Sequence, residues 1–259
     1  MTTENHIVDV IKSVSVKGSK ILPNREMLIN FTSSWKAVTA EFISTLLLLF
    51  FGCMSCLPLQ GHSNQPPLYA PFGFGFIVLF NIQAFGHISG AHMNPAVTLG
   101  AVLWGKMTIP LGIAYFIAQC SGAAIGYGML LAVSPVDLIP AGICTTQFQT
   151  QLTEIQALAI EVVLTASLNF LNCAIWDPTN ASNLESVSLK FGLTITGLSI
   201  AGGPLTGASM NPARSLGPAL WTGQWSTHWV YWIGPLFGGS LSALFYKHVW
   251  LNKISDGAN

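Results

Sequence analysis

Charged residues are scarce in this chain. Of its 259 residues, 10 are Lys or Arg and 10 are Asp or Glu, so 8% are charged, against about 25% in soluble globular proteins. Hydrophobic residues make up 51% and the mean hydropathy is +0.55. We therefore expect much of the surface to face the hydrocarbon of a lipid bilayer. The formal net charge is +0 and basic residues form no cluster, which argues against nucleic acid as a partner.

Cysteines are few and odd in number. Most of them lie in apolar runs, so we expect free core residues and no disulfide framework. Cys53 and Cys56 form a C-x-x-C pair, but the surrounding LLLLFFGCMSCL is an apolar run rather than the strand–helix context of a redox motif. The five are Cys53, Cys56, Cys120, Cys144 and Cys173.

Six long apolar runs are separated by more polar segments. Most approach the ~20 residues that a helix needs to cross ~30 Å of hydrocarbon, which predicts an all-α membrane protein with six transmembrane helices. Two further apolar segments, Pro95–Trp104 and Pro212–Trp221, would as helices rise only about 15 Å, half of a bilayer. The predicted spans are Trp35–Leu57, Tyr69–Phe85, Ile109–Val133, Ile155–Trp176, Val187–Ala201 and Thr227–Trp250.

The two halves of the chain repeat each other. NPAVTLGAVLW at 94–104 matches NPARSLGPALW at 211–221, and a glutamate, Glu41 or Glu161, precedes each by a similar interval. Each repeat holds three spans, so the second is inserted upside down relative to the first, an arrangement typical of transport proteins with a midplane site. The predicted organisation is a segment 1–34, repeats 35–133 and 155–250, a connecting loop 134–154, and a tail 251–259.

The distribution of basic residues predicts the orientation. The loops at 58–68 and 134–154 contain no Lys or Arg, so the positive-inside rule places them outside and both termini in the cytosol. The first apolar run would be retained as an anchor, because residues 1–34 lack the features of a cleavable signal peptide. The sequons at Asn30 and Asn180 would then lie in the cytosol and stay unmodified. Basic residues that fit this topology are Lys12, Lys17, Lys20, Arg25, Lys36, Lys106, Lys190, Lys247 and Lys253.

Each Asn-Pro-Ala sequence predicts the start of a half-helix. Asn is a preferred N-cap and Pro is favoured at the first helical position. The preceding segments, His87–Met93 and Gly202–Met210, are expected to be irregular backbone lining a wet cavity at mid-bilayer. Asn-Pro can also be a simple turn, but its occurrence twice in register argues against that alternative. The predicted motif residues are Asn94, Pro95, Ala96, Asn211, Pro212 and Ala213, and the predicted pore-lining carbonyls belong to Gly90, Ala91, His92, Gly207, Ala208 and Ser209.

Three charged residues lie at membrane depth. Arg214 follows Asn211 by one helical turn and should face water near the extracellular mouth, because an unpaired Arg in lipid is costly; a buried salt bridge to Glu is the alternative. Glu41 and Glu161 could each accept N–H bonds from the irregular loop of their own repeat, or could relay protons. Their symmetric occurrence favours loop support.

Other chemistry finds little support in the sequence. His87 and His92 are five residues apart, a spacing unlike that of a helical metal pair, and no third ligand accompanies them, so no metal site is expected. No nucleophile, base and orienting group occur together, so the chain is not expected to be an enzyme.

The paired motifs carry a family resemblance. SGAHMNPAVT at 89–98 and TGASMNPARS at 206–215, within six predicted spans, resemble the major intrinsic proteins, the aquaporin and aquaglyceroporin family. The resemblance implies a homotetramer with one pore per subunit and no cofactor. It also implies a channel whose pore diameter, lining donors and Arg decide which solutes pass.

The resemblance further implies a narrow filter made of Phe74, Ser199, Ala208 and Arg214. Water-selective members have His where this chain has Ser199, and glycerol facilitators usually have Trp, Gly and a second aromatic residue. Ser215 and the Tyr231-Trp232 pair are similar to the water branch. This combination resembles the entomoglyceroporins.

Because Ser is smaller than His, we expect passage of water, glycerol and urea. We also expect that ions and protons are excluded and that the channel lies in the plasma membrane. A water-only channel and a proton-coupled carrier using Glu41 and Glu161 are the alternatives. Ala208 replaces the Cys of mercury-sensitive members, so block by mercury at that position is not expected.

Overall fold

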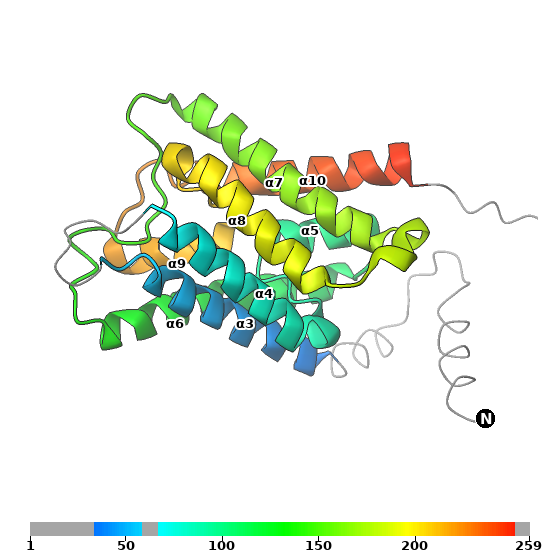
Figure 1. Ribbon diagram of the computed structural model, residues 1–259, viewed down its shortest axis with the longest axis horizontal. Coiled ribbons are helices and arrows are strands. Elements are labelled where there is room, and N and C mark those ends of the chain that lie inside the picture. The colour runs from blue at the N-terminus through cyan, green and yellow to red at the C-terminus, as the bar shows by residue number, and fades with distance from the viewer. Residues whose placement is uncertain (1–33, 59–66, 252–259) are drawn as a thin grey trace, which may run out of the picture. The chain divides into compact units, whose positions relative to one another are not determined.

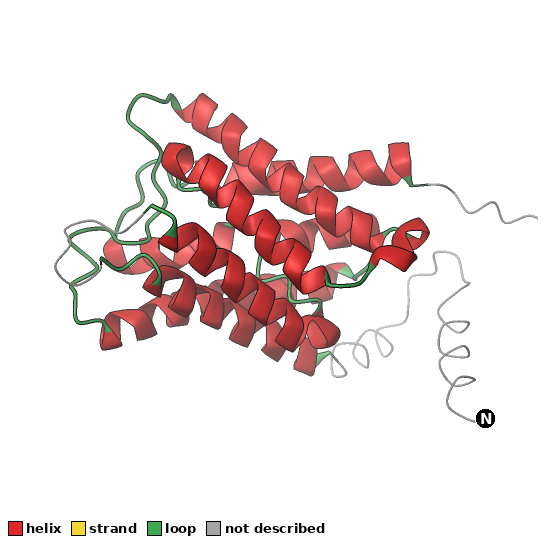
Figure 2. Ribbon diagram, in the orientation of Figure 1, coloured by secondary structure: helices red, strands yellow, loops and turns green. Residues whose placement is uncertain are grey.

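The computed structural model describes residues 34–58 and 67–251, and every regular element in these ranges is helical (Figures 1 and 2). Of the earlier expectations, those on residues 1–33, including Asn30, on most of the loop 58–68 and on the tail from 252 lie outside the described residues. The elements are α3 (Trp35–Met54), α4 (Tyr69–Ser89), α5 (Pro95–Trp104), α6 (Ile109–Val133), α7 (Glu154–Trp176), η1 (Pro178–Asn183), α8 (Val187–Thr206), α9 (Pro212–Thr222), α10 (Val230–Phe245) and the π-helical turn η2 (Tyr246–Trp250).

The predicted all-α membrane fold is confirmed. Within the described ranges, α3, α4, α6 and α7 are both long and apolar enough to cross a bilayer. Helix α8 has 20 residues but carries several polar groups, and α10 has 16 residues before it continues into η2. Large apolar side chains face outward, among them Ile117, Val163 and Phe237 with exposed fractions of 61%, 64% and 57%. Such an exterior is suited to hydrocarbon rather than to water.

The two repeats interlock through their half-helices. Helix α3 packs on α6 and α7 packs on α10, as equivalent pairs. Half-helix α5 of the first repeat lies against α10 of the second, and α9 of the second lies against α6 of the first. Each half-helix therefore packs mainly against the opposite repeat, which joins the two inverted repeats at their interface.

Two equivalent glycines allow the long helices to approach closely. A Cβ on Gly122 would lie 2.4 Å from the Phe42 carbonyl oxygen, and one on Gly238 would lie 2.3 Å from that of Val162. Only a residue without a side chain fits at such a backbone-to-backbone contact.

The irregular segments are shorter than predicted. Helix α4 continues through His87 to Ser89, and α8 continues through Pro204 to Thr206. Both helices end at glycines in the left-handed region, Gly90 at φ 86° and Gly207 at φ 79°, which permit the chain to reverse. The first residues of the predicted irregular segments, from His87 to Ser89 and from Gly202 to Thr206, are therefore helical.

The expectation that all five cysteines are free was wrong. Cys53 at the end of α3 forms a disulfide with Cys144, 91 residues later, with the two Cα atoms 5.4 Å apart. The loop after α6 returns over the end of α3, which the local apolar context of each cysteine could not reveal. Cys56, Cys120 and Cys173 are free.

Candidate functional site

The half-helices α5 and α9 begin beside each other in the interior. The Asn94 side chain accepts a hydrogen bond from the Ala96 N–H at 2.8 Å, and that of Asn211 accepts from Ala213 at 3.0 Å. Proline occupies the first turn of both helices. Both starts have the local chemistry of an Asn N-cap followed by Pro.

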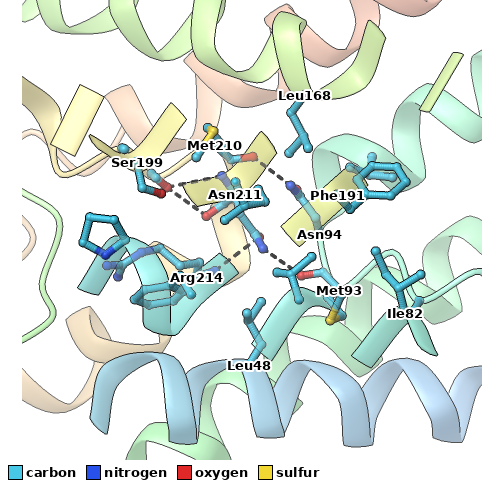
Figure 3. Close-up of a pocket in the computed structure, with 18 of the residues that line it drawn as sticks. Leu48, Ile82, Met93, Asn94, Leu168, Phe191, Ser199, Met210, Asn211 and Arg214 are labelled. Atoms are coloured by element: carbon cyan, nitrogen blue, oxygen red, sulfur yellow. Dashed lines mark hydrogen bonds between the residues drawn. The ribbon is translucent and has the colours of Figure 1, made fainter. Parts of the chain in front are cut away.

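The two asparagines are oriented by reciprocal bonds across the repeats. Asn94 Nδ2 donates to the Met210 carbonyl and Asn211 Nδ2 donates to the Met93 carbonyl, both at 2.7 Å (Figure 3). An amide group has two N–H donors, so each asparagine keeps a second donor beyond the one that fixes it. Both side chains line the same cavity.

Each loop before a half-helix holds several residues in the left-handed region. The first loop includes Ala91 at φ 47° and Met93 at φ 52°, and the second includes Ala208 at φ 45° and Met210 at φ 52°. Non-glycine residues in this region cost about 1–3 kcal/mol each and persist only where the surroundings hold them. Gly90, Ala91 and His92 of the first loop, and Gly207, Ala208 and Ser209 of the second, line the cavity.

A buried glutamate holds each loop. The Glu41 carboxylate accepts from the backbone N–H groups of His92 and Met93, both at 2.8 Å, and is itself fully buried. Glu161, also fully buried, accepts from those of Ser209 at 2.9 Å and Met210 at 2.8 Å. These bonds offset the cost of freeing the loop backbone from a helix.

Neighbouring hydroxyl and amide groups complete the two networks. Ser89 and Gln119 donate to Glu41, and Thr206 donates to Glu161. Sequence reasoning missed these three donors. Ser89 and Thr206 could have been found, because each ends a helix directly before Gly in the repeated motif. Gln119, in the middle of α6, gave no comparable signal.

The expected filter residues line one cavity. Phe74 of α4, Ser199 of α8, Ala208 of the second loop and Arg214 of α9 all border it. The Arg214 guanidinium carbon lies 4.7 Å from the centroid of the Phe74 ring, a cation–π contact. Its Nη1 donates to the Cys144 carbonyl at 2.7 Å. The equivalent position in α5 is Val97, so this charge belongs to one repeat only.

Two neighbours of Arg214 were not anticipated. The Cys144 carbonyl lies in the loop after α6, and the free thiol of Cys56 also borders the cavity. The alternative of a buried salt bridge is not what the described residues show, since none of their carboxylates forms an ion pair with Arg214. His92, whose backbone carbonyl was predicted to line the pore, also pairs its ring Nδ1 with the Thr98 hydroxyl at 3.1 Å.

The cavity has a volume of about 1160 Å³. It borders Thr145 and Pro67 toward one end of the helices and Trp176 and Ser186 toward the other. Both asparagines line it between these ends. A helical membrane protein with a cavity of this kind, crossed by the tips of two opposed half-helices, has the architecture of a channel.

Comparison with known proteins agrees with this architecture. The sequence model of the Major intrinsic protein family matches residues 29–246. Aquaporin-4 of Mus musculus is 38% identical over 223 residues, covering 85% of this chain and 69% of that protein. Aquaporin-2 of Rattus norvegicus is 39% identical over 217 residues, covering 83% and 78%.

A solved structure shares the fold. The aquaglyceroporin from Plasmodium falciparum superposes with a TM-score of 0.74 at 24% identity, covering 83% of this chain and 96% of that chain. The chain belongs to the major intrinsic protein family. It is a multi-pass membrane channel for water or small solutes, and not an enzyme.

Proposed function

We propose that this channel passes water, glycerol and urea passively and excludes ions and protons. The observation that carries the proposal is the composition of the cavity that Arg214 lines. Ser199 and Ala208 are both small, and both border the cavity. A hydroxymethyl group in place of an imidazole leaves room for a three-carbon polyol. A water-type frame with this filter is similar to the entomoglyceroporins.

Ion exclusion follows from the converging half-helices. Each helix N-terminus carries roughly half a positive elementary charge, and α5 and α9 begin on the two asparagines that border the cavity. Two positive ends and the Arg214 guanidinium repel cations. The asparagine amides donate to a solute oxygen, which orients water against a proton wire, while the loop carbonyls provide acceptors for a dehydrated solute.

Two other functions compete with this one. A water-selective channel is suggested by the names of the relatives, aquaporin-4 and aquaporin-2. A proton-coupled carrier would need Glu41 or Glu161 to titrate during transport. Both carboxylates already accept bonds from two backbone N–H groups each, which favours a structural role for them.

The substitution Ser199→His tests the proposal. We expect proteoliposomes containing the variant to lose at least tenfold in glycerol permeability while water permeability changes less than twofold, because the imidazole narrows the opening. Ser199→Ala is the matched control, since it removes the hydroxyl without adding volume, and it should keep glycerol flux.

Stopped-flow light scattering under an inward glycerol gradient measures both fluxes. Equal losses of water and glycerol in Ser199→His would place Ser199 outside the constriction. Fast water flux without glycerol re-swelling in the wild type would establish the water-only channel, and saturable uptake that follows a pH gradient would establish the carrier.

We further propose cytosolic termini, a homotetramer and a plasma-membrane location. Lys36, Lys106, Lys190 and Lys247 fit the positive-inside rule in this orientation. The disulfide supports it too, because Cys144 lies in the loop 134–154, which would face the oxidising exterior. Protease access to tags at either end of the protein in intact cells tests the orientation.

A further inference from the structure

The loop between α6 and α7 contacts Arg214 through a backbone group. The Cys144 carbonyl accepts the hydrogen bond from Arg214 Nη1. Arg214 is only 8% exposed, and among the described residues its guanidinium has no other hydrogen-bond acceptor. This carbonyl, together with the Phe74 ring, therefore positions the guanidinium.

Cys144 adopts a backbone conformation that needs support. Its φ of 68° lies in the left-handed region, at a cost of about 1–3 kcal/mol for a residue other than glycine. Three anchors hold the segment around it. Tyr127 OH donates to the Ile143 carbonyl at 2.8 Å, the Thr146 hydroxyl donates to Ser215 at 2.8 Å, and the disulfide ties Cys144 to Cys53.

The last turn of α3 supports both groups that contact Arg214. Cys53 anchors the Cys144 carbonyl through the disulfide, while its neighbour Gly52 leaves space for the Phe74 ring. A Cβ on Gly52 would lie 2.5 Å from Phe74 Cε1, so the ring occupies the space that a side chain would fill. Gly52 and Cys53, which are consecutive in α3, thus position the two groups that contact Arg214: the aromatic ring and the carbonyl acceptor.

We propose that the Cys53–Cys144 disulfide is a specificity-determining element that holds Arg214 against the wall of the pore, and that its reduction by an external dithiol narrows the channel. The proposal rests on the proposed function of a wide filter. On reduction the dithiol gives two electrons and two protons to the disulfide, which becomes two thiols, while the dithiol closes to its own cyclic disulfide. Ala208 and Ser199 are short, so a released guanidinium has room to lean into the lumen.

The test compares oxidised and reduced channel in proteoliposomes. Treatment with dithiothreitol should lower the ratio of glycerol to water permeability threefold or more, because the larger solute is obstructed first. Removal of the dithiol and re-oxidation by an added disulfide such as oxidised glutathione, which is itself reduced to two thiols, should restore the ratio. Titration under denaturing conditions should count three thiols before reduction and five after it.

Variants separate this bond from the remaining thiols. The double variant Cys53→Ser/Cys144→Ser should show the low ratio and no response to dithiol. Cys120→Ser/Cys173→Ser should behave as the wild type. Cys56→Ser should also keep the response, which excludes an effect at the thiol that borders the cavity. If the double variant does not fold, the reduced and re-oxidised wild type decides the question.

Three results would overturn the proposal. These are five thiols before reduction, a bond that resists dithiol in the folded channel, and an unchanged permeability ratio when the count rises from three to five. Failure of the proposed function is distinguishable, because the oxidised wild type would then pass no glycerol, whereas the thiol count would still report on the bond.

Discussion

Replacing Glu161 with Gln should destabilise the channel more than the same change at Glu41. Glu161 Oε1 accepts from the Thr206 hydroxyl and from the Ser209 N–H, and Oε2 accepts from the Met210 N–H at 2.8 Å. An amide nitrogen in place of either oxygen would face a backbone N–H. In the Oε2 position, both that nitrogen and the Met210 N–H would lose their partners.

Glu41 has a neighbour that can compensate in part. Gln119 Nε2 donates to Glu41 Oε2 at 2.8 Å, while Gln119 Oε1 is buried without a hydrogen-bond partner in the part of the chain that the structure describes. In Glu41→Gln the Gln119 amide can turn, so that Oε1 accepts from the new amide. The Met93 N–H would still lose its acceptor.

An orphaned buried polar group costs about 1–3 kcal/mol. With two orphaned groups in Glu161→Gln and one in Glu41→Gln, we expect Glu161→Gln to lose about 2–6 kcal/mol of stability and Glu41→Gln to lose about 1–3 kcal/mol. At about 2–4 °C per kcal/mol for a domain of this size, the apparent Tm of Glu161→Gln should fall by about 4–24 °C. Thermal unfolding in detergent, followed by tryptophan fluorescence, measures the difference.

The matched control removes the compensating group. Adding Gln119→Met to Glu41→Gln should bring its loss to at least that of Glu161→Gln. Equal losses in the two single variants, with no effect of Gln119→Met, would refute the hydrogen-bond reasoning. Unchanged stability together with loss of pH-driven uptake would instead favour a proton relay.

Two further predictions concern packing and a loop charge. Gly122→Ala should cost about 1–3 kcal/mol, because its Cβ would lie 2.4 Å from a backbone oxygen of α3, whereas Gly197→Ala, with nothing within 4 Å, should be neutral in the same melting assay. Burial alone raises the pKa of Asp177, but hydrogen bonds from Thr179 and Tyr246 outweigh it and hold the pKa below its usual value. Because this pKa is lowered in the folded state, the ionised carboxylate stabilises the fold at neutral pH, and this stabilisation is lost as the pH falls through the folded pKa. Tyr246→Phe should therefore lower the apparent Tm at pH 7, with a smaller difference below about pH 4; an equal difference at both pH values would contradict the assignment.

Local sequence signals predicted the regular elements well. Asn followed by Pro gave the first residue of α5 and α9, because capping depends on adjacent residues. The ends of α4 and α8 were predicted too early, since Gly86 and Gly202 remain helical and only the later glycines turn the chain.

Contacts between distant segments were harder to predict. The Cys53–Cys144 bond and the Cys144 carbonyl at Arg214 join segments 91 and 70 residues apart. Gln119 is another example, since it reaches Glu41 from the middle of a different helix. Such contacts depend on how the helices are arranged in space. At these positions the sequence alone gives no signal for that arrangement.

The exchange of half-helices between the repeats bears on how the protein matures. During synthesis the first repeat is made before α10, so α5 initially lacks the helix on which it packs in the complete protein. Conductance should accordingly arise in one late step, after the whole polypeptide has been inserted. A truncated protein that consists of the first repeat would form no pore unless a second copy, inverted in the bilayer, replaced the missing second repeat.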